Sequence, residues 1–304
     1  MKLLKTLRTI ARYIRRLYRH CKANKGLYGY PVINVELVTL GILKSKKISP
    51  LVISRNPQLI VSLTSYEARL KIVHRVIYSL FLQNCKPDRI VLWLSDTCTH
   101  IPRKLRFFEK YGLEIRFTED IRSYKKLVPS VETFPDSILV TCDDDMWYSE
   151  SWLALLYDSY KEIPEAVHCH VVRRIIKDDR GVPIQYNKWP FAKDTDLSYQ
   201  QIGIGAGGIL YPPGVFSTTE VTDKRIFMQL APYADDLWFW CMAVRSGHPY
   251  RLVPNSLPKY IYISFLSALG ISRETPLHAI NMKQNLNIEQ YNALATKFPE
   301  ILIL

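Results

Sequence analysis

The sequence lacks any apolar run long enough to cross a membrane. Its longest apolar stretches, Leu237–Val244 and Tyr260–Ile271, fall well short of the about 18–20 residues that a spanning helix needs. The chain also does not open with the combination of a basic start, an apolar core and a small-residue cleavage site that marks a secretory leader. We therefore expect no transmembrane span and a location on the cytoplasmic side of a membrane.

Paired cysteines are missing as well. The cysteines are scattered and form no CxxC pair: Cys21, Cys85, Cys98, Cys142, Cys169 and Cys241. This pattern indicates a reducing, cytoplasmic setting. Internal repeats and low-complexity tracts are also absent, and 48% hydrophobic residues in a chain of 304 are enough for a large core.

Acidic residues are absent from residues 1–26, although the whole chain has 41 Lys+Arg against 28 Asp+Glu and a net charge of +13. Nine cations lie in this segment: Lys2, Lys5, Arg8, Arg12, Arg15, Arg16, Arg19, Lys22 and Lys25. The rest of the chain is only mildly basic. This distribution argues against a nucleic-acid surface spread over the fold and favours a specialised N-terminal segment.

Residues 1–26 have the pattern of a basic amphipathic helix. Apolar residues recur at alternating steps of four and three: Leu3, Leu7, Ile10, Ile14 and Leu17. Such a helix lies in the headgroups of an anionic membrane, where each cation adds up to ~1 kcal/mol, or packs on the body or a partner helix. We expect the first, as a peripheral contact on the cytoplasmic face of the inner membrane, followed by a connector with short strands at 27–57.

From residue 58 onward, short apolar runs alternate with helical spacing. The pattern predicts strands at 59–63, 89–94, 113–117 and 137–142, and helices at 67–83, 102–111 and 124–133. This alternation is typical of an α/β fold with a mostly parallel sheet flanked by helices. Ligands then bind at the carboxyl ends of the strands.

The pattern is looser beyond residue 148. It predicts helices at 151–160 and 235–244, a strand at 166–172 and a glycine-rich stretch at 203–208. We therefore divide the body, residues 58–304, into a nucleotide-binding half at 58–148 and a second-substrate half at 149–304.

An acidic cluster follows the predicted strand Ile138–Cys142. Asp143, Asp144 and Asp145 repel one another unless a divalent cation neutralises them, and carboxylate oxygens favour Mg²⁺ or Mn²⁺. If the strand geometry continues, Asp143 and Asp145 point to one side, where they can share a metal. A solvated acidic turn is the alternative.

The sequence resembles glycosyltransferases of the GT-A fold over roughly residues 58–300. The matching stretches are VSLTSYEAR at 61–69, KPDRIVLWLS at 86–95, RSYKKLVP at 122–129, TCDDDMWY at 141–148, GAGGILYPP at 205–213 and ADDLWFW at 234–240. It is similar to family-2-like enzymes that build bacterial surface polysaccharide, lipopolysaccharide outer core or capsule. The resemblance implies a Rossmann-like GT-A fold and a DxD motif whose metal bridges the diphosphate of a sugar nucleotide.

The resemblance also implies a donor site and a metal site. The residues expected around the nucleotide are Thr64, Ser65, Tyr66, Arg69, Ser95, Asp96, Arg122, Lys125, Asp143 and Asp144. Asp143 and Asp145 are the expected ligands of Mn²⁺ or Mg²⁺, with His278 as a further ligand or a surface histidine. Arg273 would neutralise the departing diphosphate. For Lys126, a solvated basic face is nearly as good an explanation as donor binding.

The second half supplies the expected acceptor side and base. Gly207 and Gly208 border the sugar and acceptor in the resembling family, although a plain tight turn fits each of them. Trp238 either stacks on a sugar ring or belongs to the core. The resemblance implies that Asp235 or Asp236, with Asp236 favoured, is the catalytic base of an inverting enzyme. The alternative is that both are simply placed at a helix N-terminus, which favours acids by about 0.3–1 kcal/mol.

His168 and His170 alternate on a predicted strand, and they are read equally well as structural or as facing the acceptor. Together these patterns predict a metal-dependent glycosyltransferase that moves a sugar from a nucleotide-sugar donor to a glycan or glycolipid hydroxyl. A metal-dependent phosphoryl transferase or hydrolase is one alternative. A non-enzymatic, membrane-associated binding module is the other.

Overall fold

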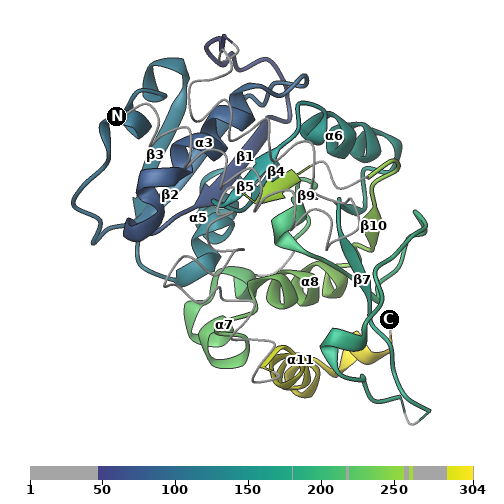
Figure 1. Cartoon of the computed structure of the whole chain (residues 1–304). Coiled ribbons are helices and arrows are strands. Elements are labelled where there is room, and N and C mark those ends of the chain that lie inside the picture. Colours follow the sequence, from purple (N-terminus) through teal and green to yellow (C-terminus); the bar gives the residue numbers. More distant parts are fainter. Residues whose placement is uncertain (1–46, 180, 217–218, 257–259, 263–285, 304) are drawn as a thin grey trace, which may run out of the picture.

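The computed structural model describes residues 47–179, 181–216, 219–256, 260–262 and 286–303 (Figure 1). The predicted helix at 1–26, most of the connector at 27–57, and both Arg273 and His278 lie outside these residues. Among the helices that the structure describes, none combines the length and the apolar character needed to cross a bilayer.

A seven-stranded sheet forms the centre of the molecule, with the order β10-β6-β9-β4-β1-β2-β3. Its strands are β1 (Leu59–Thr64), β2 (Arg89–Ser95), β3 (Leu113–Thr118), β4 (Ile138–Cys142), β6 (Val167–Cys169), β9 (Ile209–Tyr211) and β10 (Tyr250–Leu252). All neighbouring pairs are parallel except those that β9 makes with β4 and β6. The predicted α/β fold with a mostly parallel sheet is therefore confirmed.

Two short ribbons accompany the sheet. One pairs β5 (Met146–Tyr148) with β11 (Tyr260–Tyr262), and the other pairs β7 (Val172–Arg174) with β8 (Gln201–Gly203).

The α-helices are α3 (Leu70–Phe81), α4 (Arg103–Arg106), α5 (Val128–Thr133), α6 (Trp152–Glu162), α7 (Lys224–Leu230), α8 (Asp235–Arg245) and α11 (Leu286–Lys297). Short 3₁₀ helices are η1 (Glu67–Arg69), η2 (Glu109–Tyr111), η3 (Arg122–Lys126), η4 (Tyr186–Lys188), η5 (Gly205–Gly207), η6 (Thr219–Thr222) and η7 (Pro299–Leu302).

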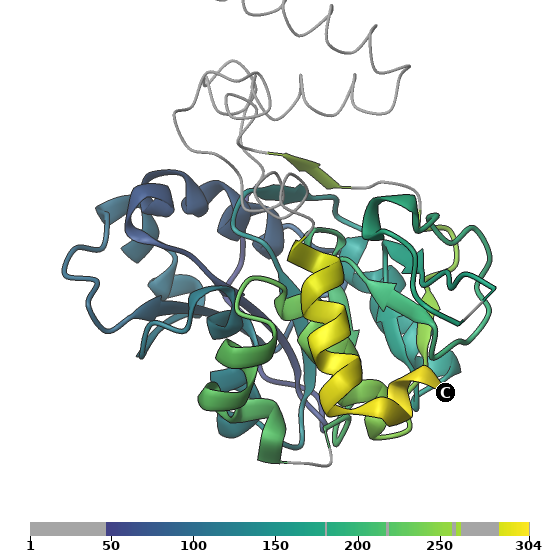
Figure 2. The ribbon, with the colours of Figure 1, turned by 90° about the horizontal axis from the view of Figure 1, so that it is seen from below.

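The sheet separates two hydrophobic cores. Side chains alternate along the strands, so Val61 and Leu63 of β1 enter one core while Ile60 enters the other. The first core is covered by α3, α4 and α6. The second is covered by α5, α7, α8 and α11, and Figure 2, seen from below, shows α7 and α11 on this side of the molecule. Each core draws residues from both sides of residue 148.

Three predicted elements are interrupted. The helix expected at 102–111 consists of α4 and η2, which ends at Gly112 with φ of 101°. The helix expected at 124–133 is divided into η3 and α5, because Pro129 occupies the first turn of α5, where its missing N–H is tolerated. The strand expected at 166–172 divides because β7 leaves the sheet to pair with β8.

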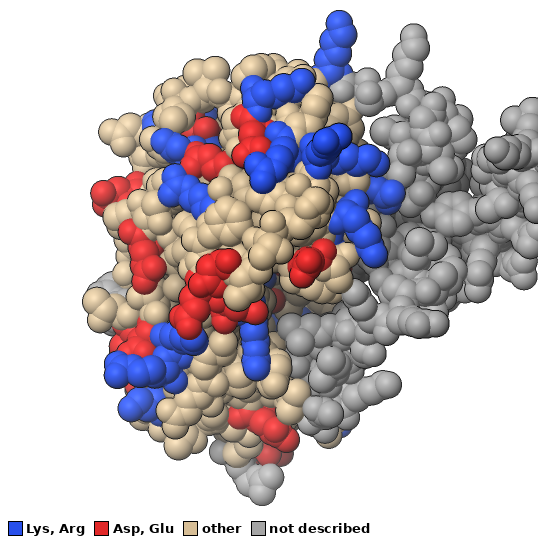
Figure 3. All heavy atoms as spheres, turned by 90° about the vertical axis from the view of Figure 1, so that its left-hand side faces the viewer, with Lys and Arg blue, Asp and Glu red and all other residues tan. Residues whose placement is uncertain are grey.

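Basic and acidic side chains are interspersed on the face of the molecule shown in Figure 3.

Candidate active site

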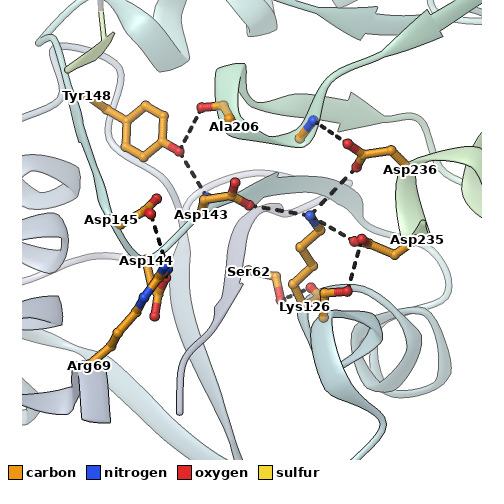
Figure 4. Close-up of polar contacts among 12 residues, drawn as sticks. Ser62, Arg69, Lys126, Asp143, Asp144, Asp145, Tyr148, Ala206, Asp235 and Asp236 are labelled. Atoms are coloured by element: carbon orange, nitrogen blue, oxygen red, sulfur yellow. Dashed lines mark hydrogen bonds and ion pairs between the residues drawn. The ribbon is translucent and has the colours of Figure 1, made fainter. Parts of the chain in front are cut away.

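The carboxyl ends of β1 and β4 meet at one edge of the sheet. Leu63 lies beside Cys142 in the register of these strands, so the residues that follow both strands emerge together. The loop before β9, which contains η5, and the first turn of α8 reach the same edge. Figure 4 shows the polar side chains that gather there, with Lys126 between two groups of aspartates.

The first group is the acidic turn, Asp143–Asp145, which joins β4 to β5. Asp144 accepts hydrogen bonds from Ser65 Oγ at 2.5 Å and from Arg69 Nη1 at 2.6 Å. Asp145 Oδ2 lies 3.1 Å from the same guanidinium nitrogen. Asp143 points the other way, with Oδ1 at 3.3 Å from Lys126 Nζ.

The expectation that strand alternation directs Asp143 and Asp145 to one side is therefore wrong, whereas their joint binding of a metal stays a prediction. The strand ends at Cys142, and Asp144 and Asp145 form a turn. Alternation no longer applies in a turn, so the side chains of Asp144 and Asp145 both reach Arg69.

Charging the acidic turn is unfavourable. Burial raises the pKa of Asp145 to about 7, with a further contribution from the negative charge of Asp143. Burial also raises the pKa of Asp144, although Arg69 and Ser65 oppose this effect. The turn therefore holds more negative charge than its own partners neutralise.

The second group is the acidic pair, Asp235 and Asp236, in the first turn of α8. Asp235 Oδ1 accepts a hydrogen bond from Ser123 Oγ at 2.9 Å, and Asp236 Oδ2 accepts one from the Gly205 N–H at 2.9 Å. The helix N-terminus favours both charges. Even so, burial raises the pKa of Asp236 to about 7, and Asp235 raises it further while Lys126 lowers it.

Lys126 joins the two groups. Its Nζ lies 2.9 Å from Asp235 Oδ2 and 3.7 Å from Asp236 Oδ1, in addition to its contact with Asp143. The residue is only 5% exposed, so the expectation of a solvated basic face is wrong. The apolar residues Leu127 and Val128 that follow Lys126 were a sequence signal for its burial. The carboxylates that make this burial tolerable, however, are distant in sequence.

Glycine at 205 is required by this arrangement. A Cβ there would lie 2.7 Å from both Asp236 Oδ1 and Lys126 Nζ. The expected acceptor glycines face protein instead, because a Cβ at Gly207 would meet Val171 and one at Gly208 would meet Trp152. Their close packing sets the path of the loop toward Gly205.

Tyr148 ties this loop to the acidic turn, a connection that sequence patterns did not reveal. The Asp143 N–H donates to the Tyr148 hydroxyl at 2.9 Å, and the hydroxyl donates to the Ala206 carbonyl at 3.2 Å. Tyr148 is buried, 1% exposed, and Figure 4 shows it above Asp143.

Several expected donor residues lie near the same edge. Thr64 Oγ1 donates to the Trp93 carbonyl at 2.9 Å. Tyr66 is 46% exposed, and its ring centroid lies 5.3 Å from the Arg69 guanidinium. Ser95 and Asp96 are at and just after the end of β2, where the Ser95 hydroxyl contacts that of Thr97 at 2.7 Å.

Arg122 and Lys125 are not brought to the carboxylates of the site. Arg122 Nη1 donates to the Pro232 carbonyl at 3.0 Å, and its guanidinium lies 4.4 Å from the Tyr233 ring centroid. Lys125 is buried and pairs with Asp120.

Trp238 is not available to a sugar. Its side chain is fully buried, its indole N–H donates to the Val221 carbonyl at 3.1 Å, and its ring contacts Phe227. The expectation that it stacks on a sugar is therefore wrong.

His168 and His170 are structural. His168 bonds Ser159 Oγ and the Ile163 carbonyl, both at 2.9 Å, while His170 Nε2 bonds the Trp152 carbonyl at 2.9 Å. Both histidines are buried.

The acidic turn fits a divalent cation in part. Within the described ranges, no group of three or more His, Cys, Asp or Glu is arranged to hold a metal. Mg²⁺, however, is commonly bound through one or two carboxylates, with substrate phosphates and water completing its shell. Asp143 and Asp145, whose mutual repulsion disfavours ionisation of Asp145, match that donor set.

Comparisons with known proteins assign no family. No protein-family profile and no curated protein matches the sequence. Similar solved structures include residues 1–349 of S. aureus TarS, with 14% identity and a TM-score of 0.47, covering 79% of this chain and 72% of that one. The same TarS region in complex with UDP has 16% identity and a TM-score of 0.43, covering 65% of this chain and 58% of that one.

HddC from Yersinia pseudotuberculosis gives 11% identity and a TM-score of 0.34, covering 52% of this chain and 78% of that one. At these values, none of the three likenesses assigns a function to this chain.

Proposed function

We propose that the protein is a metal-dependent, inverting glycosyltransferase that moves a sugar from a nucleotide-sugar donor to a hydroxyl of a glycan or glycolipid. The supporting observation is that the acidic turn and the acidic pair both contact Lys126, at the edge of the mostly parallel sheet where β1 and β4 end. One group has an excess of negative charge that suits a cation. The other contains a carboxylate that exchanges a proton near neutral pH.

The donor side of this proposal is the acidic turn with Arg69. Asp143 and Asp145 would hold Mg²⁺ or Mn²⁺, which supplies Lewis-acid stabilisation of the leaving diphosphate when bound. Ser65 and Arg69 fix Asp144 and thereby the turn. Tyr66, exposed beside Arg69, offers a face for the base of the nucleotide.

The base side is Asp236. The acceptor hydroxyl transfers its proton to the Asp236 carboxylate as its oxygen attacks the anomeric carbon. The bond from that carbon to the diphosphate breaks, and the diphosphate leaves with the electron pair. Attack from the face opposite the leaving group inverts the anomeric configuration. The pKa of Asp236, about 7, suits a general base at neutral pH.

The cellular setting is part of the same proposal. A basic helix at residues 1–26 would bring the enzyme to the anionic inner membrane, where it would act on lipopolysaccharide or another surface polysaccharide. Arg273 and His278 stay predictions, as donor-binding and metal-binding residues respectively.

A ligand screen tests the proposal. Thermal unfolding is measured with UDP-, GDP-, CMP- and TDP-sugars, in Mn²⁺ and in chelator, because selective binding stabilises the native state. We expect one donor class to raise the melting temperature only with the metal, and saccharide product to form with a suitable acceptor. Release of free phosphate alone would indicate a phosphoryl transferase or hydrolase. Salt-sensitive nucleic-acid binding without donor binding would indicate a binding module.

A further inference from the structure

The charges around Asp236 are unbalanced. Asp143, Asp235 and Asp236 all lie within 3.7 Å of Lys126 Nζ. The negative charge of Asp236 also disfavours ionisation of five other side chains, which are Tyr124 of η3, Tyr186 of η4, Tyr211 of β9, Tyr250 of β10 and Cys169 of β6. Burial raises the pKa of each of these groups, so all are neutral near pH 7. Within the described part of the chain, Lys126 is thus the single cation that opposes these three carboxylates.

The position of Lys126 is fixed from both sides. Ser62 Oγ donates to the Lys126 carbonyl at 2.6 Å and contacts Ser130 Oγ at 2.8 Å, which also accepts from the Trp93 indole N–H at 2.8 Å. At the other end, Gly205 leaves room for the ammonium against Asp236. A long, flexible side chain is therefore held at one place between β4 and α8.

We propose that Lys126 is a positioning residue that binds the donor-side carboxylate Asp143 and the base-side carboxylates Asp235 and Asp236 into one cluster, and that it keeps Asp236 ionised for the proton transfer. This inference rests on the proposed function. It assigns no contact between Lys126 and substrate. Loss of the ammonium leaves Asp235 and Asp236 to repel each other, so the free energy of ionising Asp236 increases.

Lys126→Met tests this role because it keeps the length of the side chain and removes the charge. On the acidic side of the dependence of kcat on pH, the midpoint is expected to move to a pH that is higher by about one unit or more. At pH values below this midpoint, the ionised fraction of Asp236 is then roughly tenfold lower than in the wild type. The matched control is Arg251→Met. Arg251 is also buried and pairs with Glu162 at 2.9 Å, so its loss is expected to lower stability without moving this midpoint.

Gly205→Ala provides a second variant, since it keeps the ammonium but displaces it. The added Cβ is expected to separate Lys126 from Asp236 and to move the midpoint in the same direction by a smaller amount. If Lys126→Met fails to fold, this variant supports the same measurement.

A titration without substrate separates this inference from the proposed function. The Asp236 carboxyl carbon is followed by ¹³C NMR in protein labelled at Asp, with Asp236→Asn used for assignment. A higher midpoint in Lys126→Met, or in Gly205→Ala, supports the positioning role. An unchanged midpoint in both overturns it. Absence of transfer by the wild-type protein with every donor would instead overturn the proposed function, while the NMR titration still decides the role of Lys126.

Discussion

The acidic turn and the acidic pair each bring carboxylates close together, and they differ in the number of cations that oppose the negative charge. The turn places three carboxylates against two cations, with Asp144 and Asp145 on Arg69 and Asp143 on Lys126. The pair places both carboxylates on Lys126 alone, with Ser123 and the Gly205 N–H as neutral donors. Each group therefore contains one carboxylate, Asp145 or Asp236, with a pKa raised to about 7.

The difference lies in how each group can be neutralised. In the turn, Asp143 contacts Lys126 through Oδ1 and Asp145 contacts Arg69 through Oδ2, so the two carboxylates are opposed by separate cations. In the pair, both carboxylates contact one buried ammonium. Protonation of a carboxylate is therefore the simplest way to remove the negative charge that this ammonium does not offset. We infer that the turn is suited to a metal ion and the pair to proton transfer.

Asp145→Asn should have the largest effect on this comparison. The change would remove one of the two proposed metal ligands, and a loss of several kcal/mol of transition-state stabilisation corresponds to ~10³–10⁴-fold in kcat. Metal-dependent nucleotide binding should be lost as well, as measured by calorimetry. The melting temperature should stay the same or rise, because charging Asp145 is costly in the folded protein. Asp136→Asn, at an exposed position, is the control; a matching loss there would rule out a specific role for the turn.

Asp236→Asn should abolish proton transfer and spare the donor site. Kcat is expected to fall by ~10²–10⁴-fold, the range for a general base, while the affinity for the nucleotide in the presence of Mn²⁺ stays near that of the wild type. Steady-state kinetics and calorimetry on the same preparation separate the two effects. A larger loss of kcat in Asp235→Asn than in Asp236→Asn would transfer the role of base to Asp235.

The pH profile distinguishes the pair from ordinary surface carboxylates. A carboxylic acid with a raised pKa is protonated, and cannot accept a proton, until the pH passes that pKa. The kcat of the wild type should therefore rise about tenfold per pH unit on the acidic side and level off near pH 7. Rates from pH 5 to 9 at saturating metal check this. A plateau that begins near pH 4 would contradict the assignment.

Tyr148→Phe should have the smallest effect, and it tests the link between the turn and the loop before β9. The change leaves the Asp143 N–H and the Ala206 carbonyl without their partner, at a cost of about 1–2 kcal/mol in the free energy of unfolding. Urea denaturation measures the loss. Tyr199→Phe is the comparison, since its hydroxyl donates to the Gly247 carbonyl at an exposed position, where water replaces the bond. Equal costs in both variants would show that the Tyr148 bridge has no special role.

The regular part of the fold was predictable because its signals are local. The strands β1, β2 and β4 are short apolar runs bounded by polar residues, and burial on both faces requires that composition. The start of α8 was also predictable, since Asp235 and Asp236 precede an apolar helix. These two features were enough to place both acidic groups on the chain.

The contacts within the site were less predictable because they depend on distant residues. Lys126 alone has the character of a surface cation, and only carboxylates from two other elements make its burial favourable. The directions of Asp143 and Asp145 depend on where β4 stops, which composition does not reveal. Trp238 follows the acidic pair closely, but its place on the inner side of α8 depends on how the helix packs.

The reversed direction of β9 has a consequence for how such a protein can diversify. Between β6 and the reversed strand β9, the chain runs through residues 170–208, which include the β7–β8 ribbon and touch the sheet through the bridge of Ser198 to Tyr250 of β10. Insertions into the outer part of this excursion need not disturb any strand of the sheet or the aspartates at its edge. The segment between β6 and β9 can thus change in length or sequence while the carboxylates at the edge of the sheet keep their positions.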